Sequence, residues 1–212
     1  AYTKGDPNNV DLMRSRFAAG HRIQLAASRR WMVGKSMDFR VSAYYDGASG
    51  RPYHFTIPSD FNGDGRTTND LFFVPANQGQ VGVINGTWDQ LNAYIENDPV
   101  LSKQRGKIID KHSGWGPWTN TLDVATSLGF NVSGRRIELR ADVQNFLNVL
   151  NKEWGTVDFA TFGDLGAIPI TIGADGRMTY NLATITSPTY IKYDRDNIRS
   201  RYRAQLGARV RF

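Results

Sequence analysis

The C-terminal segment from Ser200 to Phe212 alternates between apolar and polar side chains. A side-chain period of two is typical of a β-strand, because successive side chains point to opposite faces. One face carries Tyr202, Ala204, Leu206, Ala208, Val210 and Phe212. The other carries Arg201, Arg203, Gln205, Gly207, Arg209 and Arg211. An unbroken apolar face opposite four arginines exceeds what a half-buried strand of a soluble domain requires, and it predicts a strand of a membrane β-barrel.

Four earlier segments show the same alternation, so the sequence predicts an all-β fold. In the second of them, one face carries Met37, Phe39, Val41, Ala43 and Tyr45. Arg29 interrupts the apolar face of the first segment near its end, where an arginine can reach lipid headgroups. With the final segment, the predicted strands span residues 21–33, 37–47, 119–132, 136–147 and 200–212.

The connections between these strands alternate between tight and long. Tight turns are expected at 33–36 and 133–135, and long connections cover 1–20, 48–118 and 148–199. Membrane barrels join their strands by short periplasmic turns and long extracellular loops. We therefore expect the long connections to be extracellular loops and the C-terminus to lie at the periplasmic rim.

Two local elements are predicted inside the long connections. Trp88, Leu91 and Tyr94 have helical spacing, which predicts a short helix over 87–97. Residues 168–172 and 178–182 flank Ala174-Asp175-Gly176, a pattern that predicts a local hairpin.

Five strands are too few to close a barrel. Single-chain bacterial barrels have an even number of strands, starting at about eight. An open edge in lipid would leave backbone donors and acceptors unsatisfied. We therefore expect further barrel strands upstream of Ala1. No apolar run approaches the roughly 20 residues of a membrane helix.

The basic residues follow strand parity, although the net charge is +6. We interpret them as lumen-facing groups that form salt bridges to Glu138, Asp142, other strands or a plug domain. Attraction of an anionic substrate is the alternative interpretation. A nucleic-acid partner is not expected, because the charge does not form one exposed patch. The lumen-facing set is Arg22, Arg30, Arg40, Arg136, Arg140, Arg201, Arg203, Arg209 and Arg211.

Aromatic residues gather near the ends of the predicted strands, as in the girdles at the two interfaces of a membrane barrel. Ordinary core aromatics are the alternative. The set is Trp31, Tyr45, Trp115, Trp118, Phe130, Tyr202 and Phe212.

No catalytic site is predicted, so we do not expect an enzyme. The three histidines, His21, His54 and His112, lie in or beside loop regions and share no motif. The chain has no cysteine and no His-x-x-x-His pair for zinc. It also lacks a Gly-x-Ser-x-Gly nucleophile elbow and a phosphate-binding glycine loop.

One loop has the spacing of a calcium site. In a motif that starts at Asp60, oxygen-bearing side chains occupy positions 1, 3 and 5, and a glycine occupies position 6. The backbone carbonyl of position 7 would supply a further ligand. Leu71 occupies position 12, where a glutamate is usual, so Asp70 at position 11 has to close the site. An Asx-rich turn without metal is the alternative. The predicted Ca²⁺ ligands are Asp60, Asn62, Asp64, Arg66 and Asp70.

Several motifs resemble those of a known family. The ending Gln205-x-Gly207-x-x-Val210-x-Phe212 resembles the C-terminal signal read by the barrel assembly machinery, and residues 138–148 are similar to the penultimate strand of TonB-dependent transporters. The segments 60–75, 101–107 and 150–155 resemble the Oar-like, carboxypeptidase-regulatory-domain-containing branch of TonB-dependent receptors.

The resemblance covers nearly the whole chain. It implies the C-terminal part of a large, about 22-stranded antiparallel barrel with an N-terminal plug. The implied function is active transport across the outer membrane of a Gram-negative bacterium, with this chain forming barrel wall and substrate-selecting outer loops. The implied partners are outer-membrane lipid and lipopolysaccharide, the plug domain and remaining strands, the TonB complex, and the barrel assembly machinery.

Neither a plug domain nor a TonB-contacting segment is recognised within the chain. Two alternatives stay open: a secreted calcium-binding β-sandwich or adhesin module, and a porin-type channel without a plug. The strands favour a barrel over a sandwich, because sandwich strands average about five or six residues.

Overall fold

A computed structural model describes Lys4, Asn8 and residues 12–67, 69–160, 164–166, 168–185 and 193–212, with backbone only for 164–166. Parts of the predicted loops 1–20, 48–118 and 148–199 therefore lie outside the described residues. Contacts divide the chain into two units, each built from separate segments. Unit 1 comprises Ala1–Ala19, Arg51–Gly116 and Ala160–Asp194, and unit 2 comprises Gly20–Gly50, Pro117–Phe159 and Arg195–Phe212.

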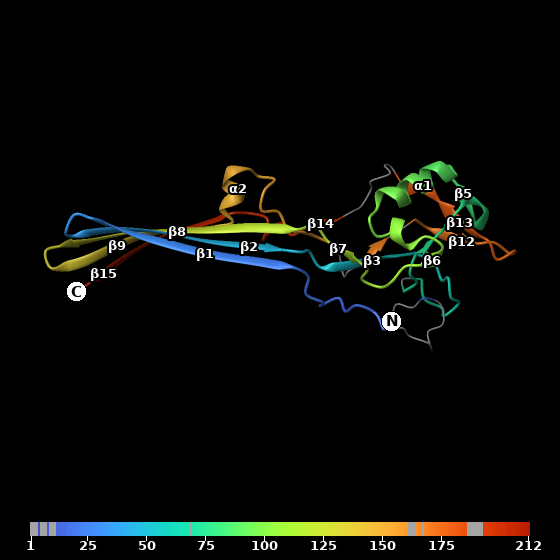
Figure 1. The fold of residues 1–212 in the computed structure, drawn as a ribbon, viewed down its shortest axis with the longest axis horizontal. Helices are drawn as coiled ribbons and strands as arrows, with labels where there is room; N and C mark the ends of the chain where they lie inside the picture. The colour runs from blue at the N-terminus through green and yellow to red at the C-terminus, as the bar shows by residue number, and fades with distance from the viewer. Residues whose placement is uncertain are drawn as a thin grey trace. The chain divides into compact units, whose positions relative to one another are not determined.

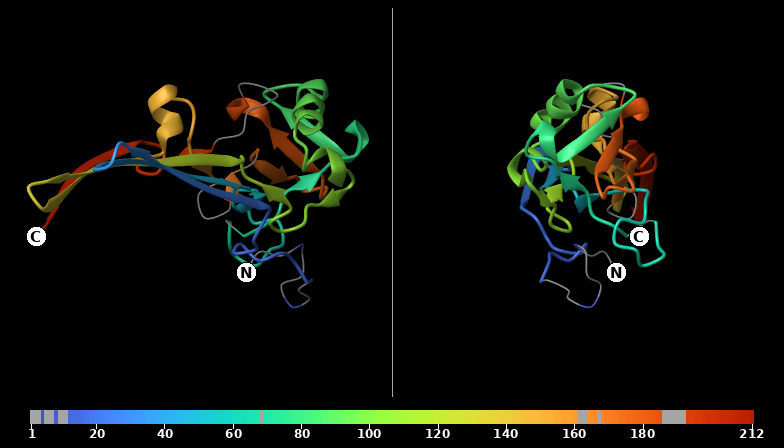
Figure 2. Two further views of the ribbon diagram at one scale, coloured as in Figure 1. Left: turned by 60° about the vertical axis from the view of Figure 1, so that its left-hand side comes forward. Right: turned by 90° about the vertical axis from the view of Figure 1, so that its right-hand side faces the viewer.

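Unit 2 is built on a five-stranded antiparallel sheet. The strand order is β1-β2-β8-β9-β15, so each long strand lies beside the next one along the chain (Figure 1). The sheet curves along its length (Figure 2). These strands are β1 (Arg22–Val33), β2 (Met37–Ala48), β8 (Thr119–Val132), β9 (Arg135–Gln144) and β15 (Arg203–Arg211). The first three match the predicted ranges closely, whereas β9 ends before the predicted 147 and β15 begins after the predicted 200.

The register aligns like side chains across the whole sheet. Trp31 pairs with Phe39, Phe39 with Leu128, Leu128 with Leu139, and Leu139 with Ala208. The neighbouring rows are mostly polar, because adjacent residues of a strand point to opposite faces; Met32 is an exception. A one-residue slip of any strand would therefore mix the two faces. We call them the apolar face and the polar face of the sheet.

Tight turns join two pairs of these strands. Gly34, with φ of 66°, lies in the β1–β2 turn. In the β8–β9 turn, Ser133 and Gly134 have φ of 51° and 77°. Two consecutive positive φ values match the right-handed twist of antiparallel strands, which makes such turns favourable in hairpins. Two short elements complete the unit, the helix α2 (Phe146–Leu150) and the two-residue strand β10 (Asp158–Phe159), which pairs with β14 (Asp194–Arg195).

Unit 1 contains more regular structure than the helix and the hairpin expected inside the long connections. Segments of all three connections fold together into one compact unit. Its helices are α1 (Trp88–Asn97), η1 (Gln78–Gln80), η2 (Ser102–Gln104) and η4 (Leu182–Thr184). Its strands are β3 (Pro52–Thr56), β4 (Phe73–Val74), β5 (Val81–Ile84), β6 (Lys107–Ile108), β7 (Gly114–Trp115), β11 (Asp164–Gly166), β12 (Ile170–Ile172) and β13 (Met178–Asn181).

The small sheets of unit 1 have the orders β11-β3-β7, β12-β13-β5 and β4-β6. Two of the pairs are parallel, β11 with β3 and β13 with β5, which a purely antiparallel fold does not include. Parallel pairing requires a long chain segment between the partners, and these partners come from different connections.

Both local predictions are confirmed. Helix α1 begins after Thr87, whose hydroxyl accepts a hydrogen bond from the Gln90 N–H at 3.3 Å, while the Gln90 side chain accepts from the Thr87 N–H at 2.9 Å. This reciprocal capping satisfies two donors at the helix start. The hairpin joins β12 and β13, with Ile170 opposite Tyr180.

All the buried hydrophobic residues in the described part of the chain belong to unit 1. Phe72 and Tyr180 pack edge to face with ring centroids 5.6 Å apart, and the Tyr180 hydroxyl donates to the Phe73 carbonyl at 2.6 Å. Burial raises the pKa of the Tyr180 phenol. Unit 1 therefore has the core of an ordinary globular domain.

Leu101→Ala is expected to lower the free energy of unfolding of unit 1 by about 2–5 kcal/mol, because it leaves a cavity at a fully buried position. Urea unfolding followed by pulse proteolysis measures the change. Leu12→Ala removes the same atoms at an exposed position, and we expect a shift below about 0.5 kcal/mol. Equal losses in the two variants would contradict the assignment of the core.

Candidate functional site

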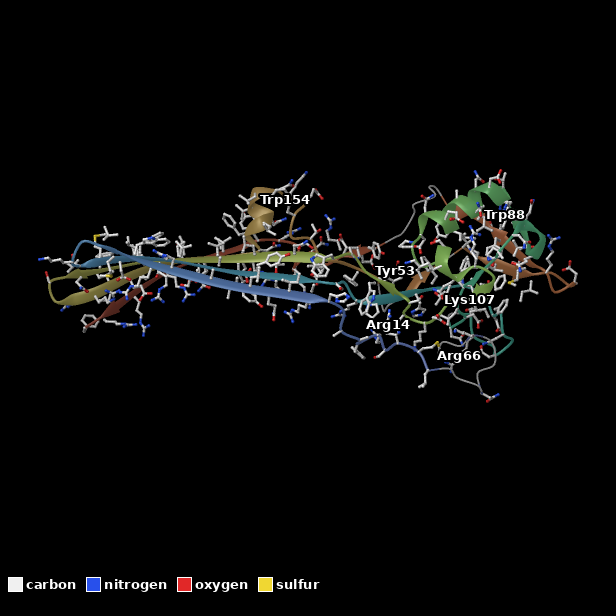
Figure 3. All side chains as sticks on the ribbon, viewed as in Figure 1. Arg14, Tyr53, Arg66, Trp88, Lys107 and Trp154 are labelled. Atoms are coloured by element: carbon white, nitrogen blue, oxygen red, sulfur yellow. The ribbon has the colours of Figure 1, made fainter. Side chains whose placement is uncertain are left out.

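The apolar face of unit 2 has no core of its own. None of its described hydrophobic residues is buried. Leu25 is 62% exposed, Leu206 84% and Trp31 44%. Contiguous apolar surfaces of this extent mark sites of contact with membrane or protein. The face is therefore the leading candidate for a functional surface (Figure 3).

The polar face is cross-linked by ion pairs between strands, and one of them reaches from β2 across β8 to β9. The Arg22 guanidinium donates two hydrogen bonds to the Asp46 carboxylate, at 2.8 and 2.9 Å. Asp38 accepts from Arg30 at 2.9 Å and also from Arg136. This geometry supports the interpretation of the lumen-facing arginines as salt-bridge partners.

Of the six other arginines in the predicted lumen-facing set, one forms an ion pair within the sheet. Arg140 pairs with Asp142, its neighbour two residues along the strand, at 2.7 Å. Glu138 lies opposite Arg209, yet it forms no ion pair within the described part of the chain. Of the predicted lumen-facing set, the members that form no ion pair with a described residue are Arg40, Arg201, Arg203, Arg209 and Arg211.

Aromatic residues mark both ends of the sheet. At the end with the tight turns, Trp31 and Phe39 stack with centroids 6.0 Å apart, and the Arg29 guanidinium lies 5.9 Å from the Trp31 ring. At the other end, the Tyr45 hydroxyl and the Trp118 indole N–H both donate to the Asn120 side chain, at 2.6 and 2.9 Å.

One member of the predicted girdle is wrongly placed. Trp115 belongs to β7 in unit 1, so it is not at an end of the large sheet. Trp154, which the sequence did not single out, lines a pocket of about 440 Å³ together with Tyr45 and Trp118. Its side chain is 52% exposed.

Asn145 organises the connection that follows β9, a role that sequence reasoning missed. It adopts a left-handed conformation with φ of 53°, which ends the strand. Its backbone N–H donates to Asp123 at 2.8 Å, and its side-chain amide donates to the carbonyls of Gly155 at 2.9 Å and Arg199 at 3.3 Å. Asn145 thereby joins β8 to both ends of the connection.

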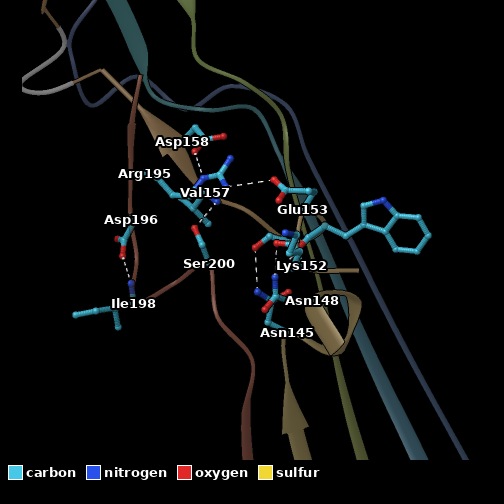
Figure 4. Close-up of polar contacts among 12 residues, drawn as sticks. Asn145, Asn148, Lys152, Glu153, Val157, Asp158, Arg195, Asp196, Ile198 and Ser200 are labelled. Atoms are coloured by element: carbon cyan, nitrogen blue, oxygen red, sulfur yellow. Dashed lines mark hydrogen bonds and ion pairs between the residues drawn. The ribbon is translucent and has the colours of Figure 1, made fainter. Parts of the chain in front are cut away.

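Other side chains continue this network (Figure 4). The Asn148 amide donates to the carbonyls of Lys152 and Trp154, at 2.9 and 3.1 Å. The Ser200 hydroxyl accepts from the Val157 N–H at 2.9 Å. The break in alternation at Asn145 is the sequence signal that could have pointed to these residues.

Arg195 and Asp196 fix the chain just before β15. The Arg195 guanidinium donates to Asp158 at 2.9 Å (Figure 4). The Asp196 carboxylate accepts from the N–H groups of Arg199 and Ile198, and these bonds hold its pKa below the usual range.

The four residues of the predicted assembly signal lie on or next to β15. Gln205 and Gly207 are on the polar face, while Val210 is on the apolar face and Phe212 follows the strand. A Cβ at Gly207 would meet no atom within 4 Å, so packing inside the chain does not require this glycine. Recognition by the assembly machinery stays a prediction.

The predicted calcium loop is an ordered turn whose carboxylates bind its own backbone. Asp60 accepts from the N–H groups of Asp64 and Gly65, at 3.1 and 2.9 Å. The side chain of Asn62 also accepts from Asp64, at 2.9 Å. Gly65 has φ of 81°, a conformation that favours glycine. Asp64 and Arg66 are exposed, and Arg66 lies at the surface of unit 1 (Figure 3).

Asp70 is the buried member of the predicted ligand set. Its carboxylate is 1% exposed, and one oxygen accepts from the Phe61 N–H at 2.7 Å. Burial raises the pKa of this carboxyl group, and the charges of Asp64 and Asp60 add to the effect. Among the described residues, no group of three or more His, Cys, Asp or Glu side chains is arranged to hold a metal ion.

Two of the histidines meet in unit 1, although their positions in the sequence share no motif. The rings of His54 and His112 are both buried and lie edge to face, with centroids 4.6 Å apart. His112 also contacts the Arg14 carbonyl through Nδ1, at 2.8 Å. His21 lies in unit 2. The pair therefore belongs to the packing of unit 1.

No helix in the described part of the chain is long and apolar enough to cross a membrane. No protein-family model, curated protein or solved structure matches the chain.

Asn145→Gly is expected to weaken the connection after β9 by about 1–3 kcal/mol, because glycine keeps the left-handed backbone and loses the buried amide bonds. Hydrogen exchange of the amides at 146–157 measures the loss. Asn85→Gly is the matched control, since Asn85 has φ of 54° and an exposed side chain. Unchanged exchange in Asn145→Gly would refute the organising role.

Proposed function

We propose that unit 2 forms part of the wall of an outer-membrane β-barrel that belongs to an active, TonB-dependent transporter. The observation that carries this proposal is the large sheet whose entire apolar face lacks a protein core, while the same chain builds a complete core in unit 1. Exposure of such a face to water is unfavourable. A face that the protein's own core does not bury is therefore expected to be covered by lipid or by another apolar layer.

Strand length supports lipid as the covering layer. β1 and β2 have 12 residues each and β8 has 14. At about 3.3 Å per residue, a twelve-residue strand tilted by about 40° spans about 30 Å, the thickness of the hydrocarbon layer. A soluble sandwich uses strands of about half this length.

The polar face supports a lumen on the opposite side. Its charged residues pair along and between strands, which is how charged groups are accommodated inside a barrel or against a plug. In the described residues, β1 and β15 each pair with a single long strand, and a closed barrel requires further strands at both edges.

The transport function rests on the resemblance of the loop and C-terminal motifs to TonB-dependent receptors. On this proposal unit 1, formed from the connections at the ends of the strands opposite the tight turns, is extracellular and contributes to substrate selection. The proposed partners of the whole protein are then the bilayer, lipopolysaccharide, the plug domain and the TonB complex.

Val124→Arg and Ala125→Arg test the two faces at adjacent positions in the middle of β8. Val124 lies between Ala43 and Val143 on the apolar face, whereas Ala125 lies between Ser42 and Asp142 on the polar face. Arginine at a lipid-facing midplane position costs about 2–4 kcal/mol. We expect Val124→Arg to reduce the heat-modifiable, outer-membrane form of the full-length protein and Ala125→Arg to leave it unchanged. Equal assembly of the two variants would contradict a lipid-facing apolar face.

Energy coupling separates the transporter from a passive channel. Uptake of substrate by cells that express the full-length protein should cease when TonB is deleted or a protonophore is added. A porin-type channel would continue to conduct under both conditions. Persistent uptake would therefore refute active transport while leaving the barrel assignment intact.

A further inference from the structure

We infer that the turn at Asp60–Arg66 and the buried carboxylate of Asp70 form one Ca²⁺ site, in which Asp70 links the bound ion to the core of unit 1. The ion would be held by the side chains of Asp60, Asn62 and Asp64, the Arg66 carbonyl and Asp70. These are oxygen ligands, which a hard cation such as Ca²⁺ prefers. The inference is independent of transport, because it concerns unit 1 alone.

The decisive observation is an unsatisfied oxygen on a buried carboxylate. One oxygen of Asp70 accepts from the Phe61 N–H, so the group faces the beginning of the turn, but its Oδ1 is buried without a hydrogen-bond partner. A buried carboxyl oxygen without a hydrogen-bond partner is costly in free energy. A cation beside the Asp60–Arg66 turn would satisfy it.

Asn69 provides a second such group. Its side chain is 7% exposed and its amide nitrogen donates to the Asp64 carboxylate at 2.7 Å, which orients that carboxylate. The Oδ1 of Asn69 is buried and has no hydrogen-bond partner. Two adjacent buried side chains thus present unpartnered oxygens beside the turn.

The site is connected directly to the core. The Ile57 N–H donates to the Asp70 carbonyl at 3.0 Å, and the Phe72 N–H donates to the Phe55 carbonyl at 3.1 Å. Leu71, between these bonds, is 1% exposed. Because Asp60, Asp64 and Asp70 are not arranged as a ready metal cluster, binding requires them to converge, and this movement would tighten the link between the turn and β3.

Isothermal titration calorimetry of the full chain in detergent provides the test. We expect one Ca²⁺ per chain with a Kd in the range of about 10⁻⁴ to 10⁻³ M, and no equivalent binding of Mg²⁺, which demands a tighter octahedral geometry. Asp70→Asn should weaken binding at least about tenfold, since it removes a charged ligand.

Asp175→Asn is the matched control. Asp175 accepts a backbone hydrogen bond from Arg177 at 3.0 Å in another turn of unit 1, and asparagine can still accept it. We expect this variant to bind Ca²⁺ like the unmodified chain. If Asp70→Asn does not fold, Asp60→Asn and Asp64→Asn carry the test, because their side chains are not buried.

Hydrogen exchange supplies a second readout. Ca²⁺ should slow exchange of the Ile57 and Phe72 amides by about tenfold at saturation, corresponding to about 1.4 kcal/mol. The absence of saturable binding at concentrations tenfold above the expected Kd would overturn the inference. Unaltered binding in Asp60→Asn and Asp64→Asn would do the same.

Discussion

The in-register pairing of like side chains across five strands is the constraint on which unit 2 depends. Backbone hydrogen bonds hold each strand to its neighbour, and the pairing places every apolar residue of a row on the same face. The chain gains little hydrophobic stabilisation from this face by itself, because its side chains stay exposed. The stability of unit 2 is therefore tied to whatever covers it, which on our proposal is the lipid bilayer.

Unit 1, in contrast to unit 2, buries its apolar side chains within its own core. Its strands are short, its helix packs on them, and its apolar side chains are buried against one another. Such a unit can keep its shape in water, whereas on our proposal the sheet is covered by lipid. The difference in how the two units bury apolar surface matches a division between an aqueous outer part and a wall within the membrane.

The sequence predicted the large sheet well because period-two alternation over twelve residues has few structural explanations. The helix capped by Thr87 and the hairpin around Gly176 followed from equally local patterns. β3 escaped notice because all five of its residues are buried, so its two faces do not differ in polarity. The parallel pairing of β13 with β5 joins residues about a hundred positions apart, and no local pattern encodes it.

In the candidate sites, too, some features follow from local sequence and others only from the three-dimensional packing. Spacing alone identified the Asp60–Asp70 loop, but the buried oxygens of Asn69 and Asp70 became visible only with the packing. Asn145 was passed over because its left-handed backbone and its bonds to distant carbonyls are tertiary features. Trp115 was misplaced because its position next to Pro117 and Trp118 in sequence hides the boundary between the units at 116–117.

Unit 1 is assembled from three chain segments, and two of them, Arg51–Gly116 and Ala160–Asp194, are joined to the sheet at both ends. It is therefore held by several covalent tethers. A single protease cut in one exposed segment would leave both fragments attached through the remaining tethers and the shared core. A surface domain exposed to proteolysis would gain from this redundancy, since a nicked molecule keeps its outer part.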